Sequence, residues 1–348
     1  MINNDFINNT NVNESNSFVN LLQHIDPNYE EEVNIIENSI YYDNNAFNET
    51  LQQVKGNIRI LNLNCGGLKS KFDKLKIFVS SINGDDTPLS IITLQETHFT
   101  SDTEVNLYNI PDYTLISDMA RINLFGGIAI YVHNSFSYSR LPNDILKQNS
   151  PVYESMFIEI NHNNAKFNKF IIGNIYRRPS EISDELNMFI NEITESLICI
   201  QALSKKAYIT GDFNIDLLKI NRHSYYNTFY ENITAHGFFP KITRPTRLSD
   251  VSSTLIDNIF TNNLCKKHTS GIITTPISDH LMIFCILECN ALHPSPKIKF
   301  VEIEKINHNS INDFKNSIKK ANIIEKINIE PLSDPNNNYN IFAATLID

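Results

Sequence analysis

The stretch Tyr208-Ile209-Thr210-Gly211-Asp212-Phe213-Asn214 decides how the rest of the chain is interpreted. Its apolar run predicts a buried strand, and alternation along a strand places residues i and i+2 on one face. We therefore expect Asp212 and Asn214 to point to the same side, while Gly211 lets another segment approach the backbone closely. Taken alone, the stretch is better explained by an Asx-rich turn after a buried strand, and only the other motifs of the chain favour a functional site.

The composition describes a chain able to form a large core. The 348 residues are 41% hydrophobic and 10% aromatic, which suits a large layered enzyme domain. No run reaches the ~18 apolar residues of a membrane span, and the N-terminus lacks the basic and apolar regions of a signal peptide. The 5 cysteines lack metal-type spacing, so we expect them to be reduced. These features predict an intracellular protein, nuclear or cytoplasmic, without a membrane partner, and they leave its oligomeric state open.

The formal net charge of -10, taken alone, argues against a nucleic-acid partner. Residues 1–56, however, contain nine acidic residues and a single lysine, so the rest of the chain is close to neutral. The overall charge therefore excludes neither nucleic acids nor small substrates.

Three segments of the chain differ in composition. Residues 1–56 are rich in Asn, Glu and Ser, and we expect them to be mostly disordered. Residues 57–290 alternate short apolar strands with helical patterns and are predicted to form the main folded domain. Residues 291–348 contain amphipathic pieces and are predicted to be a connector with short helices.

Strands outnumber helices in the central segment. Apolar periodicity predicts helices over 68–82, 181–203 and 225–236. The first predicted strand, over 58–64, alternates apolar and polar residues as a half-buried strand does. The pattern predicts two mostly antiparallel sheets that pack face to face with helices outside.

Polar residues stand at the ends of successive predicted strands: Asn64, Glu96, Tyr176, Asp212 with Asn214, Asp257, and Asp279 with His280. Each alone has an ordinary structural explanation, such as a helix cap or a buried histidine. Together they indicate phosphodiester hydrolysis. Carboxylate and amide oxygens are the ligands that Mg²⁺ or Mn²⁺ prefers, and a histidine beside a carboxylate is a general base for water.

These motifs resemble those of the endonuclease/exonuclease/phosphatase superfamily. The matching segments occur in the superfamily's order and are Leu63-Asn64, Leu94-Gln95-Glu96-Thr97, Asn174-Ile175-Tyr176, Gly211-Asp212-Phe213-Asn214, Ile256-Asp257 and Ser278-Asp279-His280. The resemblance implies an α/β (α+β) fold, a four-layer α/β sandwich in which two packed, mostly antiparallel sheets are flanked by helices.

The resemblance also implies a metal site. Glu96 would be the principal Mg²⁺ ligand, with Mn²⁺ as a substitute, assisted by Asn64 and Asp279. Gly66 departs from the superfamily, because many members have Asp or Asn at this position. The sequence therefore leaves open whether one metal or two take part.

Five further residues would act on the substrate according to the same resemblance. His280, oriented by Asp257, would be the base or a phosphate binder. Asp212 would position or activate water, or protonate the leaving oxygen. Asn214 and Tyr176 would hold the scissile phosphate.

A narrower resemblance points to the abasic-endonuclease-like endonuclease domain of non-LTR retrotransposons, which nicks target DNA to prime reverse transcription. It rests on the glycine-led strand over 126–132 and on the segments Tyr176-Arg177-Arg178-Pro179 and Pro245-Thr246-Arg247. It implies that DNA is contacted by Arg177, Arg178, Arg244, Thr246 and Arg247. Residues 291–348 would lead to a reverse transcriptase domain in cis, in a longer protein.

We therefore predict a Mg²⁺-dependent DNA endonuclease that hydrolyses phosphodiester bonds. The alternatives are a phosphodiesterase or phosphatase of the same superfamily that acts on a small molecule or a lipid headgroup, and a catalytically dead remnant that only binds. The arginines favour a polyanionic strand over a small headgroup, and the matched catalytic positions are intact. The sequence does not identify the target site.

Overall fold

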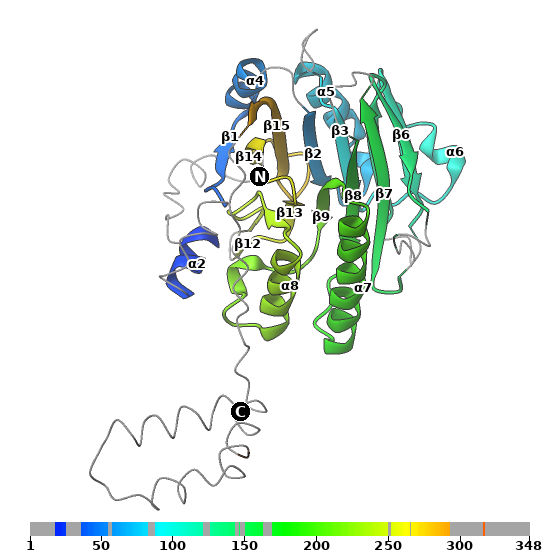
Figure 1. Ribbon diagram of the computed structural model, residues 1–348. Helices are drawn as coiled ribbons and strands as arrows, with labels where there is room; N and C mark the ends of the chain where they lie inside the picture. The colour runs from blue at the N-terminus through cyan, green and yellow to red at the C-terminus, as the bar shows by residue number, and fades with distance from the viewer. Residues whose placement is uncertain are drawn as a thin grey trace, which may run out of the picture. The chain divides into compact units, whose positions relative to one another are not determined.

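Two β-sheets, packed face to face, form the centre of the protein in the computed structural model (Figure 1). The structure describes residues 18–25, 36–54, 58–82, 88–120, 126–142, 146, 150–162, 169–249, 252–264, 266–292 and 316. The chain divides into two units, Met1–Pro296 and Lys297–Asp348, and all described residues except Asn316 belong to the first. The predicted connector over 291–348 therefore lies almost wholly outside the described residues.

The first sheet has seven strands within the described residues, in the order β1-β14-β15-β2-β3-β5-β4. Their bounds are β1 Ile40–Tyr42, β2 Ile58–Asn64, β3 Ile91–Gln95, β4 Tyr113–Asp118, β5 Ile128–His133, β14 Lys266–Ile273 and β15 Met282–Leu292. β2 runs parallel to β3 and β1 runs parallel to β14, whereas the other neighbours are antiparallel.

The second sheet has six strands in the described parts of the chain, in the order β10-β13-β9-β8-β7-β6. Their bounds are β6 Phe136–Arg140, β7 Tyr153–His162, β8 Phe170–Arg177, β9 Lys206–Asp212, β10 Phe239–Pro240 and β13 Asp257–Thr261. Only β8 and β9 are parallel in this sheet. A separate hairpin pairs β11 Arg247–Leu248 with β12 Ser253–Thr254. The prediction of two mostly antiparallel sheets is confirmed.

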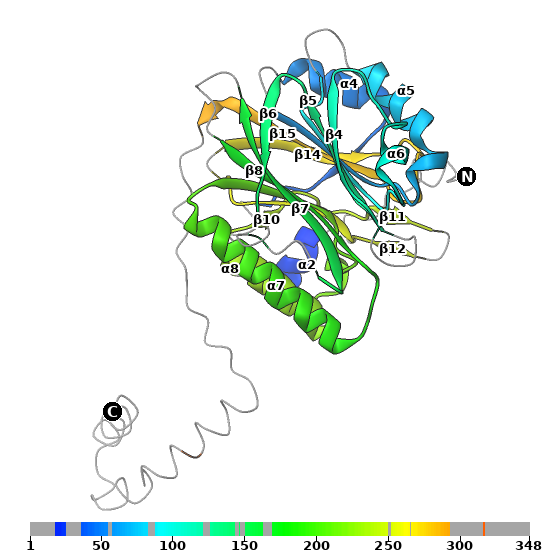
Figure 2. The ribbon, with the colours of Figure 1, turned by 90° about the vertical axis from the view of Figure 1, so that its right-hand side faces the viewer.

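Helices cover the outer faces of both sheets (Figure 2). The helices and 3₁₀ turns are α2 Phe18–Ile25, α4 Asn44–Gln53, η2 Leu68–Ser70, α5 Phe72–Ile82, α6 Asp102–Val105, α7 Ser183–Ala202, η3 Leu217–Lys219 and α8 Ser224–Ala235. Two hydrophobic clusters divide the core: one joins α4 and α5 to the first sheet, and the other joins the inner faces of both sheets to α7 and α8. The four-layer sandwich that the resemblance implied is confirmed.

Strand β2 illustrates how the sequence builds these layers. Its side chains alternate between the two faces, as in any strand. Ile58 and Ile60 belong to the cluster between the sheets, whereas Leu61 and Leu63 belong to the cluster beneath α4 and α5. All seven residues are buried, so the expectation of a half-buried strand is wrong. Both faces are buried and both accept polar residues: Asn64 reaches Asp212 of the other sheet, whereas Arg59 binds carbonyl oxygens at the end of α4.

The N-terminal segment 1–56 differs from the expectation of disorder wherever the structure describes it. Phe18 of α2 is buried, and its ring lies edge-on to Tyr230 of α8 with centroids 5.0 Å apart. In α4, Phe47 and Leu51 are buried, and Phe47 packs on Phe284 of β15. A few large apolar residues in an Asn-rich background are enough to anchor the segment, which is why its composition misled the prediction.

Backbone pairing ties the same segment to the C-terminal part of the domain. β1 extends the first sheet by pairing with β14, and the backbone nitrogen of Ser39 donates to Oγ1 of Thr243 at 2.8 Å. The predicted boundary at residue 57 therefore falls inside the folded unit.

Among the helices that the structure describes, none combines the length and the apolar character needed to cross a bilayer.

Candidate active site

Two of the three parallel strand pairs, β2 with β3 and β8 with β9, bring Asn64, Glu96, Tyr176 and Asp212 to one edge of the sandwich, because parallel strands end on the same side of a sheet. β2 and β3 are in register at Asn64 and Gln95, so Asn64 and the next residue, Glu96, lie side by side. In the other sheet, β8 and β9 are in register at Tyr176 and Asp212.

Asn64 connects the site across the two sheets. Its Nδ2 donates to Glu96 Oε1 and to Asp212 Oδ2, in both cases at 2.8 Å. Its Oδ1 accepts a hydrogen bond from the backbone nitrogen of Gly66 at 3.0 Å. The amide nitrogen, and not the oxygen, therefore faces Glu96, so Asn64 would have to rotate before its oxygen could bind a metal.

Asp212 and Asn214 come together by a different route from the predicted one. β9 ends at Asp212, and Asn214 lies beyond the strand with a left-handed φ of 47°. The Asn214 backbone nitrogen donates to Asp212 Oδ1 at 2.9 Å, which closes an Asx turn, and its Nδ2 donates to Asp212 Oδ2 at 3.2 Å. Both interpretations of the stretch are thus correct: a buried strand is followed by an Asx turn.

Gly211 is approached closely by the neighbouring strand β8. A Cβ on Gly211 would stand only 1.9 Å from the carbonyl oxygen of Ile175, so the predicted close approach of another segment is present.

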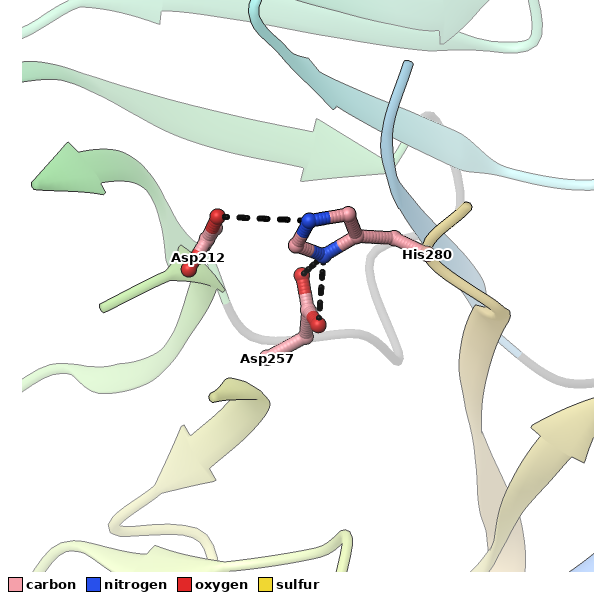
Figure 3. Close-up of side chains that lie close together, drawn as sticks. All are labelled: Asp212, Asp257 and His280. Atoms are coloured by element: carbon pink, nitrogen blue, oxygen red, sulfur yellow. Dashed lines mark hydrogen bonds and ion pairs between the residues drawn. The ribbon is translucent and has the colours of Figure 1, made fainter. Parts of the chain in front are cut away.

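His280 lies between two buried carboxylates (Figure 3). Its Nδ1 is 2.9 Å from Asp257 Oδ2, and its Nε2 is 4.0 Å from Asp212 Oδ2. Asp212 and Asp257 face each other across β9 and β13. The ligand atoms of these three residues lie within 4.8 Å of one another, a grouping that is also able to hold a metal ion.

Burial and charge in this trio shift the pKa values of Asp212 and His280. Burial raises the pKa of Asp212, and the negative charge of Asp257 raises it further, to about 7. Burial lowers the pKa of His280, but the charge and hydrogen bond of Asp257, with the charges of Asp212 and Asp279, outweigh burial and raise that pKa to about 9. At neutral pH the imidazole is therefore protonated, while Asp212 is close to its midpoint.

Thr246 lies behind the trio and does not face a substrate. It is fully buried, and its Oγ1 donates to Asp257 Oδ2 at 2.6 Å. The prediction that Thr246 binds substrate is corrected: this hydroxyl holds Asp257, which in turn holds His280.

Arg177 is also corrected as a DNA contact. The side chain is 1% exposed, and it donates to the carbonyl oxygens of Phe213, Asn214 and Ser180 at 2.7, 2.7 and 3.1 Å. A buried arginine that binds three backbone carbonyls fixes the turn after β9, and it has no exposed surface with which to contact a phosphate backbone. The sequence could not separate it from Arg178, because both follow the same strand.

The other predicted substrate residues are accessible to different degrees. Arg247 is 48% exposed and donates to Asp279 Oδ2 at 2.7 Å. Arg178 and Arg244 are half-buried, and Arg178 donates to the carbonyl oxygen of Pro151. Burial works against ionisation of Asp279, but the charges of His280 and Arg247 lower its pKa.

Tyr176 and Glu96 form the other side of the site. Tyr176 is buried, and burial raises the pKa of its phenol, assisted by the charges of Glu96 and Asp212 and by a hydrogen bond to Glu96. The Glu96 side chain is 24% exposed, and its Oε2 lies 3.6 Å from His98 Nε2. Four carboxylates thus share one edge, and hard oxygen donors with excess negative charge suit a divalent cation. The residues present therefore fit such an ion, with Glu96 as the accessible ligand.

A buried polar layer beneath the site was not predicted from the sequence. Gln95 Nε2 donates to Asn62 Oδ1 at 2.7 Å and to Asn174 Oδ1 at 2.5 Å, and Thr210 Oγ1 donates to Thr93 Oγ1 at 2.9 Å. A signal was available. Asn62, Asn174 and Thr210 each precede a site residue by two positions and so share its face.

Comparison with known proteins identifies the same family that the sequence motifs resemble. The model of the Endonuclease/Exonuclease/phosphatase family matches residues 11–280. The search of curated protein sequences found no match.

Solved structures share the fold at low sequence identity. The catalytic domain of Xenopus laevis APE2 superposes with a TM-score of 0.51 at 16% identity, covering 66% of this chain and 92% of that domain. The endonuclease domain of TRAS1, a telomere-specific non-LTR retrotransposon, superposes with a TM-score of 0.51 at 12% identity, covering 68% of this chain and 100% of that domain. The family match spans most of the motifs described above, and the predicted resemblance is confirmed: this chain belongs to the endonuclease/exonuclease/phosphatase family.

Proposed function

We propose that this protein is a Mg²⁺-dependent DNA endonuclease that nicks one strand by hydrolysing a phosphodiester bond. Members of the family are hydrolytic enzymes that act on phosphodiester bonds and depend on divalent metals. The observation that carries the proposal is the hydrogen-bonded line from Glu96 through Asn64 to Asp212, beside His280 and Asp257.

Each residue of this line has a role that its environment favours. Glu96 would hold the cation, which when bound would neutralise negative charge on a phosphate oxygen. His280, protonated and fixed by Asp257, would donate to another phosphate oxygen through Nε2. Asp212, with a pKa of about 7, would accept the proton of the attacking water. The sequence allowed His280 to be either base or phosphate binder, and its raised pKa favours the second role.

Three further residues would complete the site. Tyr176 donates to Glu96 and would hold the phosphate on that side. Asn214 would present its amide beside Asp212. Asp279, paired with Arg247, would orient that arginine toward the substrate strand.

Three arginines support DNA over a small substrate: Arg247 is exposed and pairs with Asp279, and Arg178 and Arg244 are half-buried. Arg178 and Arg247 stand in the sequence segments that resemble retrotransposon endonucleases. TRAS1 is such an endonuclease and shares the fold. Residues 291–348 are proposed to form a connector that leads to a further domain.

Supercoiled plasmid tests the proposal. The full chain, incubated with Mg²⁺, should convert supercoiled plasmid to open circles, and excess EDTA should abolish this conversion. Bis(p-nitrophenyl) phosphate and an inositol polyphosphate serve as small competing substrates. Rapid turnover of either compound with intact plasmid would favour the small-molecule phosphodiesterase or phosphatase, and no turnover of any substrate would favour the binding remnant.

A further inference from the structure

The backbone of Glu96 has an unusual conformation. Its φ is 52°, in the left-handed region that a glutamate rarely occupies because its Cβ crowds the following carbonyl oxygen. Such a residue keeps this conformation only where the surrounding structure holds it there. The side chain it presents is the proposed cation ligand, so whatever holds this backbone also aims the carboxylate.

Hydrogen bonds to the flanking peptide groups hold Glu96. The backbone nitrogens of the next two residues, Thr97 and His98, donate to the carbonyl oxygens of Gly127 and Gly126 at 3.0 and 2.8 Å. The carbonyl oxygen of Glu96 accepts from Gly67 at 2.7 Å. The position of Glu96 therefore depends on where the Gly126–Gly127 backbone lies.

Glu154 fixes that backbone from the opposite sheet. This glutamate is on β7, is 8% exposed, and accepts the backbone N–H of Gly127 through Oε2 at 2.6 Å. Its Oε1 packs against Gly126 so closely that a Cβ there would stand 2.8 Å away. Glu154 also pairs with Tyr176 in the ladder of β7 and β8. Both carboxylate oxygens of Glu154 therefore contact this pair of glycines, one through a hydrogen bond and one through packing.

We propose that Glu154 is a positioning residue for the metal site: its carboxylate fixes Gly126–Gly127, and these glycines hold Glu96 in the left-handed conformation that aims it at the cation. No motif in the sequence singles out Glu154, and the proposed chemistry does not use it. The inference rests on the proposed role of Glu96 as the cation ligand.

Mn²⁺ binding to the metal-stripped full chain tests the inference without any substrate. Isothermal titration, or the electron paramagnetic resonance signal of free Mn²⁺, gives the Kd. Removing a residue that orients a metal ligand typically weakens binding about 10- to 100-fold, so Glu154→Leu should weaken Mn²⁺ by about tenfold or more. Glu154→Asp keeps the charge but is too short to reach Gly127, and it should weaken Mn²⁺ similarly. Glu154→Gln keeps an acceptor at the right length and should stay within about threefold of the wild type.

A matched control separates positioning from general destabilisation. Glu159 lies on the same strand, is 6% exposed, and pairs with Lys169 and Lys205. Glu159→Leu should lower the melting temperature as Glu154→Leu does, yet leave the Kd for Mn²⁺ unchanged. If Glu154→Leu does not fold, the comparison of Glu154→Asp with Glu154→Gln decides the question.

Glu96→Gln distinguishes the two ways of failing. If the wild type does not bind Mn²⁺, or Glu96→Gln binds it equally well, the proposed role of Glu96 is wrong. If Glu96→Gln loses Mn²⁺ while Glu154→Asp binds within about twofold of the wild type, the metal site stands and the positioning role of Glu154 is overturned.

Discussion

Asp212 is subject to opposing influences. Burial and the Asp257 carboxylate disfavour its ionised form, whereas His280 and the hydrogen bonds from Asn64 and Asn214 favour it. The balance leaves the pKa at about 7, where a carboxylate can both accept and release a proton. A residue poised in this way is a candidate for chemistry on physical grounds alone.

Substitutions in the trio should therefore separate its members. Asp212→Asn and His280→Ala should each lower the nicking rate by about 10²- to 10⁴-fold, the usual contribution of a positioned acid or base. Asp257→Asn should lower it less, because it disturbs the orientation and charge of His280 without removing the ring. Asp216→Asn is the matched control: this buried carboxylate accepts from the backbone of Leu218 and Leu255 instead, and its loss should leave the rate per folded molecule unchanged. A wild-type rate for His280→Ala would exclude the proposed mechanism.

The same pKa values predict a pH dependence of stability. Folding raises the pKa of Asp212 from 3.8 to about 7 and that of His280 from 6.5 to about 9. The folded state thus binds more protons than the unfolded state across this range, so these groups make the free energy of unfolding fall as pH rises. The Asp212 contribution is lost between about pH 4 and 7, and the His280 contribution between about pH 6.5 and 9.

Urea unfolding in EDTA checks this dependence. Asp212→Asn should gain stability relative to the wild type as pH rises from about 4 to 7, because only the wild type must then bury a second negative charge. A difference that is constant over this range would mean that the Asp212 pKa is not raised.

Substitution of Arg177 is predicted to lower the stability of the protein, whereas the substitutions in the trio are predicted to lower its nicking rate. Arg177→Ala removes three hydrogen bonds to backbone carbonyls from a side chain that is 1% exposed. Hydrogen bonds to charged groups contribute about 1.5–3 kcal/mol each in buried settings, so the loss of unfolding free energy should exceed about 2 kcal/mol. Arg178→Ala, at the next and more exposed position, should cost less than about 0.5 kcal/mol. Chemical denaturation of both variants measures the contrast.

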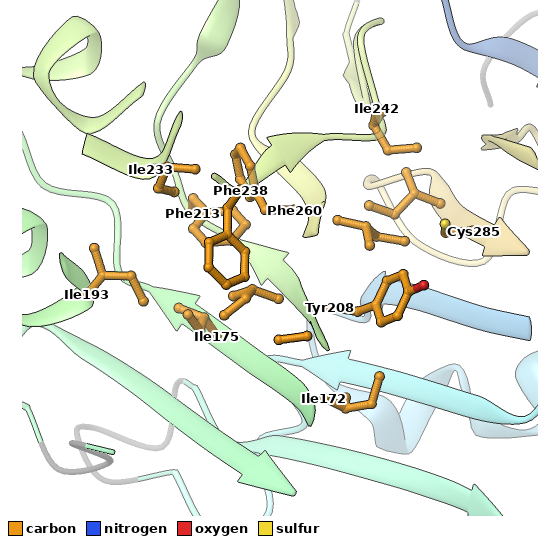
Figure 4. Packing of buried hydrophobic residues seen from close by; sticks show 14 of the residues in the cluster. Ile172, Ile175, Ile193, Tyr208, Phe213, Ile233, Phe238, Ile242, Phe260 and Cys285 are labelled. Atoms are coloured by element: carbon orange, nitrogen blue, oxygen red, sulfur yellow. The ribbon is translucent and has the colours of Figure 1, made fainter. Parts of the chain in front are cut away.

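At the scale of elements, periodicity was a reliable guide and composition was not. The predicted helices over 68–82, 181–203 and 225–236 correspond to η2 with α5, α7 and α8. The stretch from Tyr208 to Asn214 was interpreted correctly because its apolar residues are core residues. Phe213, next to Asp212, packs edge-on to Phe260 in the core beneath α8 (Figure 4). It therefore anchors the strand end that carries the Asp212 carboxylate. The N-terminal elements were missed because the Asn-rich, acidic composition of residues 1–56 was given more weight than the few apolar residues of α2, β1 and α4.

The N-terminal elements α2, β1 and α4 are predicted to stabilise the domain, whereas the composition of residues 1–56 predicted disorder. Deleting residues 1–56 should lower the melting temperature strongly, because the deletion uncovers the β14 edge and removes Phe18 and Phe47 from the core. Phe47→Ala alone should cost about 3–5 kcal/mol. Ile40→Ala is the control, since this residue is 58% exposed and its loss should change stability by less than about 0.5 kcal/mol. Calorimetry of the three proteins gives the comparison, and an unchanged melting temperature after the deletion would contradict it.

At the scale of the whole molecule, the sequence indicated which strand ends carry polar residues but not how the two sheets meet. Asn64 reaches Asp212 only because the sheets are held face to face at one offset, and the buried layer of Asn62, Gln95 and Asn174 helps to fix that offset. No local pattern reveals which side chains pair across a sandwich. For the same reason Thr246 and Arg177 were assigned to the substrate, although tertiary packing turns both inward.

Charge at the molecular surface provides the last prediction. The triple variant Arg178→Ala, Arg244→Ala, Arg247→Ala should weaken DNA binding and flatten its salt dependence by about one unit of slope for each phosphate that is no longer neutralised. Arg222→Ala, in the exposed turn before α8, should leave the slope unchanged. Binding isotherms from low to moderate salt measure both. An unchanged slope in the triple variant would favour a small-molecule substrate.

The strand order of the first sheet has a consequence for how the protein is made. β14 and β15, the last strands of the domain to be synthesised, lie between β1 and β2, which are the first. Ser39 likewise must wait for Thr243, 204 residues later, to leave the ribosome. The nascent chain therefore carries β1, and the edge of β2 that faces away from β3, without their partners until β14 and β15 are synthesised, and contacts so distant in sequence form slowly. We expect this domain to complete its fold only after its C-terminal strands emerge, and to need shielding from aggregation until then.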